Sequence, residues 1–236
     1  MSAPIRVLIH GASGRMGQTL LRLATERESL VIAGAVAPPS ADTALLGQPF
    51  CPLDRIEDAP LFDVAIDFSL PAGFDAILAL CAARGAALVS GTTGLAPQQR
   101  AMLHSASARI PVLWAANFSL GVAVLETLVE RAAATLQAWD CDIVETHHTR
   151  KLDAPSGTAL ALGEAAQRGG ADPRYTSLRA GDIIGEHLVQ FSGQGERIEL
   201  IHRATNRDVF ARGALHAAAR LAGRAPGSYR LRDLLD

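Results

Sequence analysis

The strongest constraint on the fold is a glycine-rich turn between a strand-like run and a helical segment near the start of the chain. Residues 6–10 are apolar enough for a buried strand, and they lead directly into His10-Gly11-Ala12-Ser13-Gly14-Arg15-Met16-Gly17. Glycines let a backbone approach a pyrophosphate, and helix N-termini attract anions. The spacing Gly-x-x-Gly-x-x-Gly departs from the usual Gly-x-Gly-x-x-Gly at Ser13. The turn predicts a dinucleotide site, and a turn without a ligand is the alternative.

Strand-like and helical segments alternate through the first half of the chain. The turn is followed by a predicted helix at 16–26 and a strand at 30–37, which completes a βαβ unit. Further strands are predicted at 64–68, 87–90 and 112–115, and helices at 74–84 and 97–108. Apolar strands separated by helices predict a parallel sheet covered on both faces, in an α/β, Rossmann-like domain.

The pattern changes after Asn117. A long helix is predicted at 120–135 and a less regular strand at 141–147. Strands at 186–193 and 196–204 flank the turn Gly193-Gln194-Gly195, which indicates a hairpin. This part predicts a second, α+β domain with antiparallel pairing. A last helix at 209–222 has no partner in that sheet and is expected to return to the first domain.

Composition argues against several classes of partner. Twenty-two basic and 24 acidic residues give a net charge of -2, so neither nucleic acid nor an anionic membrane is expected as a partner. No apolar run reaches the roughly 20 residues that span a bilayer, and no export signal is visible, so we expect a cytoplasmic protein. The scattered Cys51, Cys81 and Cys141 indicate reduced core thiols.

The end of the second strand bears on the choice of dinucleotide. An acidic residue there usually binds the ribose 2'-hydroxyl of NAD. Here the strand runs into Val36-Ala37-Pro38-Pro39-Ser40, and the first acid is Asp42. The missing carboxylate removes a repulsion against a 2'-phosphate, and Arg15 is placed to attract one. We predict that NADPH is accepted at least as well as NADH; a solvated Arg15 is the alternative.

Two later strand ends should meet the same ligand, because ligands of open α/β sheets lie outside the carboxyl ends of the strands. Backbone and hydroxyl groups after the strand at 87–90, and the Asn117 amide, are candidates for the nicotinamide and ribose. Ordinary turn chemistry is the alternative. The residues predicted to contact NADPH or NADH are Gly11, Ala12, Ser13, Gly14, Arg15, Met16, Gly91, Thr92, Thr93, Ala115, Ala116, Asn117 and Phe118.

The densest group of reactive side chains spans residues 145–158. Ser156-Gly157-Thr158 precedes an alanine-rich helix and predicts a carboxylate site at its N-terminus, with Lys151 adding positive charge. His147 and His148 should point to opposite faces of a strand, so one could be an acid and the other a binding group. Adjacent histidines chelate poorly, so no metal is predicted. Two histidines hydrogen-bonded in a polar loop are the structural alternative.

These residues resemble the signature of the dihydrodipicolinate reductases. The core of the match is His147-His148-x-x-Lys151-x-Asp153-Ala154-Pro155-Ser156-Gly157-Thr158-Ala159, within a similarity that runs from Glu145 to Leu162. Further matches, in the family's order, are the glycine turn, Asp67-Phe68-Ser69, Gly91-Thr92-Thr93-Gly94, Ala115-Ala116-Asn117-Phe118-Ser119 and the segment 179–187. The resemblance spans nearly the whole chain.

The resemblance implies reduction of a cyclic dicarboxylic imine, 4-hydroxy-tetrahydrodipicolinate, by hydride from NAD(P)H in lysine and diaminopimelate synthesis. It implies that His147 and Lys151 are the catalytic pair and that His148, Gly157 and Thr158 bind the substrate carboxylates. It also implies a dinucleotide-binding domain at residues 1–118 and 208–236, and a domain at 119–207 that binds substrate and builds a homotetramer. We expect a hinge between them that closes on ligands.

The sequence departs from the family in three places. The acid at the second strand's end is absent, Thr149 and Arg150 replace a basic residue and a histidine, and the stretch 169–179 looks short, as if a loop or strand were trimmed.

Two other functions remain open. A different Rossmann-type oxidoreductase, such as one acting on sugars, would not explain Lys151 beside Ser156-Gly157-Thr158. A non-catalytic NADPH sensor would not need the histidines.

Overall fold

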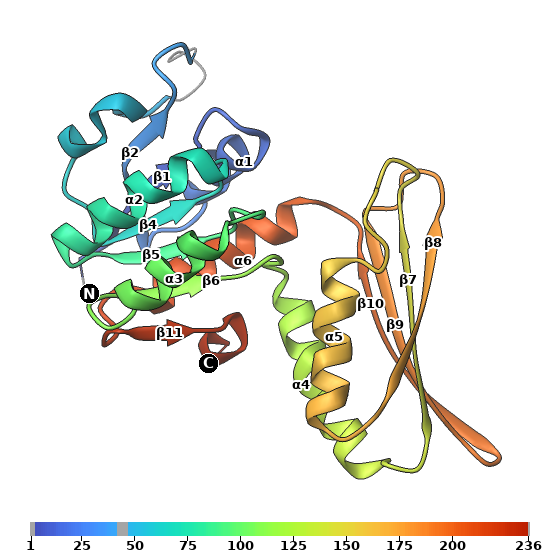
Figure 1. Ribbon diagram of the computed structural model, residues 1–236. Coiled ribbons are helices and arrows are strands. Elements are labelled where there is room, and N and C mark those ends of the chain that lie inside the picture. Colours follow the sequence, from blue (N-terminus) through green and yellow to red (C-terminus); the bar gives the residue numbers. More distant parts are fainter. Residues whose placement is uncertain (1–2, 42–46, 236) are drawn as a thin grey trace. The chain divides into compact units, whose positions relative to one another are not determined.

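The computed structural model describes residues 3–41 and 47–235, so Asp42 lies outside the described residues. The chain forms two compact units: unit 1 comprises Met1–Phe118 and Phe210–Asp236, and unit 2 comprises Ser119–Val209 (Figure 1). Within the described ranges, no helix is long and apolar enough to cross a membrane.

Unit 1 is built on a parallel sheet, which confirms the predicted Rossmann-like class. Its strands among the described residues, in sheet order, are β11 (Gly227–Tyr229), β6 (Pro111–Trp114), β5 (Ala87–Ser90), β4 (Val64–Asp67), β1 (Ile5–His10), β2 (Leu30–Ala37) and β3 (Phe50–Pro52). The edge strands β3 and β11 were not predicted, because three residues are too few to show a periodicity.

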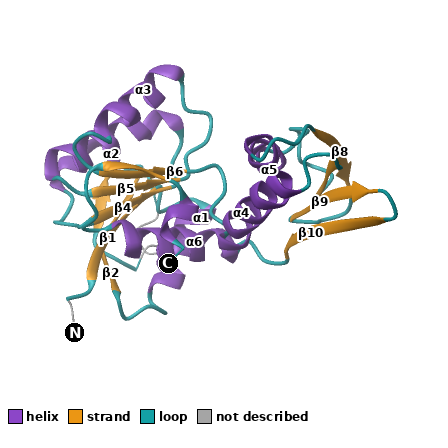
Figure 2. Cartoon of the chain, turned by 90° about the horizontal axis from the view of Figure 1, so that it is seen from below, coloured by secondary structure: helices purple, strands orange, loops and turns teal. Residues whose placement is uncertain are grey.

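The helices of unit 1 cover both faces of this sheet (Figure 2). They are α1 (Arg15–Ala24), α2 (Pro71–Arg84), α3 (Pro97–Ala106) and most of α6 (Asp208–Leu221), with the short helices η2 (Leu53–Asp58) and η3 (Leu231–Leu234). From β1 the chain continues to β2 and β3 at one edge of the sheet, and from β4 it continues to β5 and β6 toward the other edge. Because crossovers between parallel strands are right-handed, α1 lies on the opposite face of the sheet from α2 and α3. Arg212 of α6 pairs with Glu26 just after α1, at 3.0 Å.

Unit 2 contains a mixed sheet rather than the antiparallel one that the sequence predicts. Its order is β10 (Glu196–Ala204), β9 (Gly185–Gly193), β7 (Asp140–His147) and β8 (Pro173–Arg179). The β9–β10 hairpin is confirmed, but β8 runs parallel to β7. The physical reason is the helix α5 (Gly157–Arg168), which crosses between the two strands as in a βαβ unit. The stretch that looked trimmed therefore does contain a strand.

Helices α4 (Leu120–Thr135) and α5 lie on the same face of this sheet (Figures 1 and 2). Each begins at a serine N-cap: the Ser119 hydroxyl accepts from the Val122 N–H, and the Ser156 hydroxyl accepts from the Ala159 N–H. Alternate residues of the strands, such as Ile143 and Val189, are buried against the helices. Both N-cap serines also contact histidines of the sheet, Ser119 with His202 and Ser156 with His187, each at 3.1 Å.

Candidate active site

Two glycines of the turn are required by backbone contacts. Gly11 has φ of +78°, and a Cβ there would lie 2.6 Å from the Phe68 carbonyl oxygen. A Cβ on Gly17 would lie 2.3 Å from the Gly11 carbonyl oxygen. The Gly11 and Ala12 N–H groups bond to the Val36 carbonyl, so these donors hold the turn to β2. The donors that remain for an anion are the first N–H groups of α1, which begins at Arg15.

A cavity of about 450 Å³ opens beside this turn. It lies at the carboxyl ends of β1, β2 and β4, where ligands of such sheets bind. Its lining is mostly apolar, as is usual in binding sites for small ligands and cofactors. No acid lines it where β2 ends, within the described part of the chain. The lining residues are His10, Gly11, Ser13, Gly14, Val36, Ala37, Pro38, Leu53, Phe68, Ser69, Leu70, Ala72 and Gly73.

A buried polar network supports the floor of this cavity. Asp67, at the end of β4, is fully buried and lies 2.8 Å from Nδ1 of His10. The hydroxyls of Ser90 and Thr92 donate to the same carboxylate, at 2.7 and 2.8 Å. Burial would raise the pKa of Asp67, but the bonds from His10, Ser69 and Ser90 outweigh it and lower that pKa. The Thr92 hydroxyl, predicted to contact cofactor, thus lies in a network that ties β1, β4 and β5 together.

The other predicted cofactor contacts differ in exposure. A Cβ on Gly91 would meet the Phe68 ring at 2.2 Å, and Phe68 packs against the buried Phe118 ring with centroids 5.4 Å apart. Gly91 and Phe118 therefore serve packing in this structure. Arg15, Thr93 and Ala116 are exposed; Gly91, Met16, Ala115 and Asn117 are half-buried; Ala12 and Thr92 are buried.

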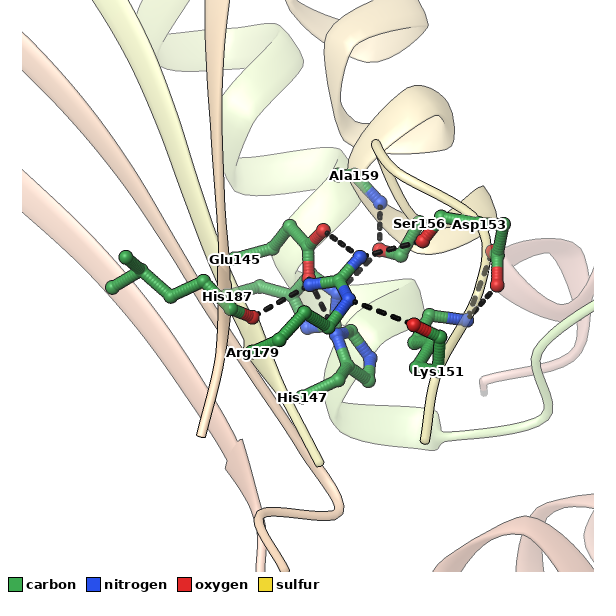
Figure 3. Close-up of polar contacts among 9 residues, drawn as sticks. Glu145, His147, Lys151, Asp153, Ser156, Ala159, Arg179 and His187 are labelled. Atoms are coloured by element: carbon green, nitrogen blue, oxygen red, sulfur yellow. Dashed lines mark hydrogen bonds and ion pairs between the residues drawn. The ribbon is translucent and has the colours of Figure 1, made fainter. Parts of the chain in front are cut away.

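The reactive cluster of unit 2 centres on His147 at the end of β7. Its Nδ1 lies 2.5 Å from Oε2 of Glu145, a carboxylate that is 1% exposed. Arg179, at the end of β8, makes a bidentate pair with Glu145 at 2.8 and 3.0 Å (Figure 3). The register that pairs His147 with Arg179 brings the three side chains together. Local sequence patterns indicate no role for Glu145 or Arg179, and only their place in the family motif marks them.

The charges decide which nitrogen of His147 carries the proton. Burial would raise the pKa of Glu145, but bonds from Arg179, Ser177 and His147 outweigh it and lower that pKa to about 2. Glu145 is therefore ionised and only accepts, so Nδ1 of His147 must donate to it. Burial lowers the pKa of His147 more strongly than Glu145 raises it. In the neutral ring Nε2 is then unprotonated, and a Cβ on Gly185 would lie 3.0 Å from this atom.

Lys151 lies in the segment that follows β7. Its side chain is 22% exposed, and its ammonium group donates to both oxygens of Asp153, at 2.7 and 2.9 Å. His148 is half-buried and follows the end of β7, whereas His147 is buried and is the last residue of that strand. Nδ1 of His148 is buried and has no hydrogen-bond partner in the part of unit 2 that the structure describes. A polar ligand would satisfy it.

The N-terminus of α5 adjoins this cluster through Ser156 and His187. The Ser156 hydroxyl lies 3.1 Å from Nε2 of His187, and the His187 ring meets that of His147 edge-on with centroids 5.2 Å apart. Burial lowers the pKa of His187 to about 4, so this ring is neutral. A Cβ on Gly157 would meet nothing within 4 Å, so the first turn of α5 is open to a ligand. The arrangement can bind a carboxylate beside a histidine and a lysine.

A Rossmann-like unit with a dinucleotide turn, combined with a second unit that gathers acid–base groups, defines a nicotinamide-dependent oxidoreductase. Comparison with known proteins narrows this class. The family "Dihydrodipicolinate reductase, N-terminus" matches residues 5–118, and "Dihydrodipicolinate reductase, C-terminus" matches residues 121–235. The chain belongs to the dihydrodipicolinate reductase family.

Relatives match over almost the full length. The 4-hydroxy-tetrahydrodipicolinate reductase of Stenotrophomonas maltophilia K279a is 70% identical over 234 residues, which is 98% of each chain. That of Xylella fastidiosa 9a5c is 61% identical over 236 residues, covering 100% of both. The fold is similar to the dipicolinate-bound dihydrodipicolinate reductase from Paenisporosarcina sp. TG-14, with a TM-score of 0.79 at 22% identity, covering 98% of this chain and 99% of that one.

Proposed function

We propose that this chain reduces 4-hydroxy-tetrahydrodipicolinate to tetrahydrodipicolinate with loss of water, using NADPH or NADH, in diaminopimelate and lysine synthesis. The observation that carries the proposal is the grouping of His147, Lys151 and the open first turn of α5 within unit 2. That grouping offers an acid–base pair beside an anion site. In this proposal unit 1 holds the dinucleotide and unit 2 holds the substrate.

The proposed residue roles follow from charge. A bound nicotinamide would supply the hydride, and the negative charge left on the imine after hydride addition would have to be neutralised by a nearby acid of this chain. His147 is the proposed proton donor or acceptor, and it must gain a proton on Nε2 before it can donate one; Lys151 is the second proposed acid group. His148, with its unpartnered Nδ1, and Gly157 and Thr158 at the start of α5 are the proposed carboxylate ligands. A substrate carboxylate would compete with Asp153 for the Lys151 ammonium group.

The decisive test is oxidation of NADPH, and separately of NADH, by the purified protein with imine made freshly from pyruvate and aspartate semialdehyde by a synthase. We expect rapid turnover that requires both reagents, with NADPH at least as effective as NADH because none of the described residues that line the cavity at the end of β2 is acidic. Tight NADPH binding without turnover would favour the sensor. A clear preference for NADH would overturn the cofactor assignment.

We also propose that the protein is a cytoplasmic homotetramer. Its three cysteines are unpaired and buried, as suits a reducing compartment. The face of the unit 2 sheet opposite α4 and α5 carries a row of side chains in register across the four strands, Thr176, Val144, Leu188 and Ile201. Ile201 is 43% exposed. Three apolar residues in one row across a sheet face would be buried by a second copy of the sheet.

The substitution Leu188→Glu is expected to break the tetramer, because it puts a charge in the middle of this row. Light scattering after size exclusion should show the wild type as four chains and the variant as smaller species. The control Leu61→Glu alters a leucine of unit 1 that is 69% exposed, and it should leave the mass unchanged. A wild type that is monomeric at micromolar concentration would rule this assembly out.

A further inference from the structure

All five N–H donors of Arg179 are used, and they reach three parts of unit 2. Nη1 and Nη2 each donate to one oxygen of Glu145, and Nη1 also donates to the carbonyl of Leu178 at 2.6 Å. Nε donates to the carbonyl of Lys151 at 3.3 Å, and Nη2 to the carbonyl of Asp153 at 2.5 Å. Figure 3 shows the guanidinium between the Glu145 carboxylate and the segment that carries Lys151.

The two proposed acid groups belong to different kinds of structure. His147 ends a strand, and its ring is oriented by the Glu145 carboxylate. Lys151 lies in a segment without regular secondary structure, where a side chain would otherwise sample many positions. Arg179 is bonded both to the carboxylate that orients His147 and to the backbone that carries Lys151. One side chain therefore joins the two groups.

We propose that Arg179 is a positioning residue. Through Glu145 it fixes the His147 ring with Nε2 toward the ligand. Through the carbonyls of Lys151 and Asp153 it holds Lys151 at a fixed distance from that ring. The inference rests on the proposed function for the identity of the reaction. Its geometric part, the orientation of His147, does not depend on which substrate is bound.

Arginine is needed here because of its donor geometry. The planar guanidinium presents five donors in a fixed fork, whereas a lysine ammonium has three rotatable donors on a flexible stem. A lysine at position 179 can keep the charge opposite Glu145, but it must give up at least two of the five bonds. A loss of activity in Arg179→Lys would therefore come from the missing hydrogen bonds and the displaced groups, because the positive charge is retained.

We expect Arg179→Lys to lower kcat by about 10- to 100-fold, because a displacement of about 1 Å can cost 10²-fold in rate. The KM for NADPH should stay within about twofold, because every contact of Arg179 described above lies in unit 2. The matched control is Arg168→Lys, which alters another arginine of unit 2 that pairs with Glu130 between α5 and α4 at 3.1 Å. Arg168→Lys should leave both kcat and the KM for NADPH unchanged.

Two further measurements separate positioning from mere stability. Millimolar guanidinium added to Arg179→Ala should restore part of kcat and leave Arg168→Ala unaffected. Long-range proton–nitrogen NMR of the histidine rings, with His147 assigned from the spectrum of His147→Gln, should show a proton on Nδ1 in the wild type. In Arg179→Lys the same signals should shift or broaden through exchange between tautomers.

Several results would overturn the inference. One is an Arg179→Lys enzyme with unchanged kcat and an unchanged His147 spectrum. Another is an NMR spectrum of the wild type in which His147 is protonated on Nε2 alone. This test uses only the wild type, so it remains valid even if the Arg179 variants fail to fold. If the wild type instead shows the expected tautomer but does not turn over the imine, the proposed function has failed while the geometric assignment stands.

Discussion

Replacing His147 with glutamine is expected to lower kcat for imine reduction by about 10³-fold, within the range usual for loss of an acid–base group. Glutamine keeps a polar side chain of similar size, but it cannot carry a proton to the product. The dissociation constant for NADPH should not change, because the dinucleotide turn and its cavity belong to unit 1. Steady-state rates and a fluorescence titration of NADPH measure the two quantities.

The control for this variant is His104→Gln, an exposed histidine on α3, which should leave both quantities unchanged. The result also decides between classes of function. An unaltered kcat would remove His147 from the chemistry. Intact NADPH binding in a wild type that lacks turnover would point to a sensor instead.

The second large effect is expected from Gly17→Ala, which should raise the dissociation constant for NADPH by about 10²-fold. The added Cβ would lie 2.3 Å from the Gly11 carbonyl oxygen and 2.5 Å from Cα of Ala12. These are backbone atoms, so the turn itself must move away from the start of α1. Loss of two charge-assisted hydrogen bonds to the pyrophosphate at about 1.5 kcal/mol each accounts for a change of this size.

Gly157→Ala is the matched control, because it adds the same methyl group at the start of a helix where nothing lies within 4 Å. It should leave the NADPH affinity unchanged, whereas the KM for the imine should rise, because Gly157 is a proposed ligand of a substrate carboxylate. Circular dichroism on Gly17→Ala checks that the unit is folded. An unchanged NADPH affinity in a folded Gly17→Ala protein would show that the turn does not bind the pyrophosphate.

The order and class of most elements could be predicted from local sequence patterns. Runs of apolar residues such as 64–68 and 87–90, separated by helical segments, were enough to predict the parallel sheet of unit 1. Hydrophobic periodicity and glycine placement act over a few residues, so they can be read without knowing the fold. His147 and Lys151 could also be predicted from the sequence, because all residues of the family motif that contains them lie in one short stretch of the chain.

Strand register placed the remaining members of the site. Arg179 is 34 residues from Glu145, and they meet because β8 pairs parallel to β7 with Arg179 opposite His147. Likewise Thr92 reaches Asp67, and His187 reaches Ser156, across elements far apart in the chain. No local pattern encodes such a pairing, because it depends on how two distant segments align. The types and order of the elements were therefore evident in the chain, whereas the pairing of β8 with β7 placed Arg179, which holds the Glu145 carboxylate beside His147.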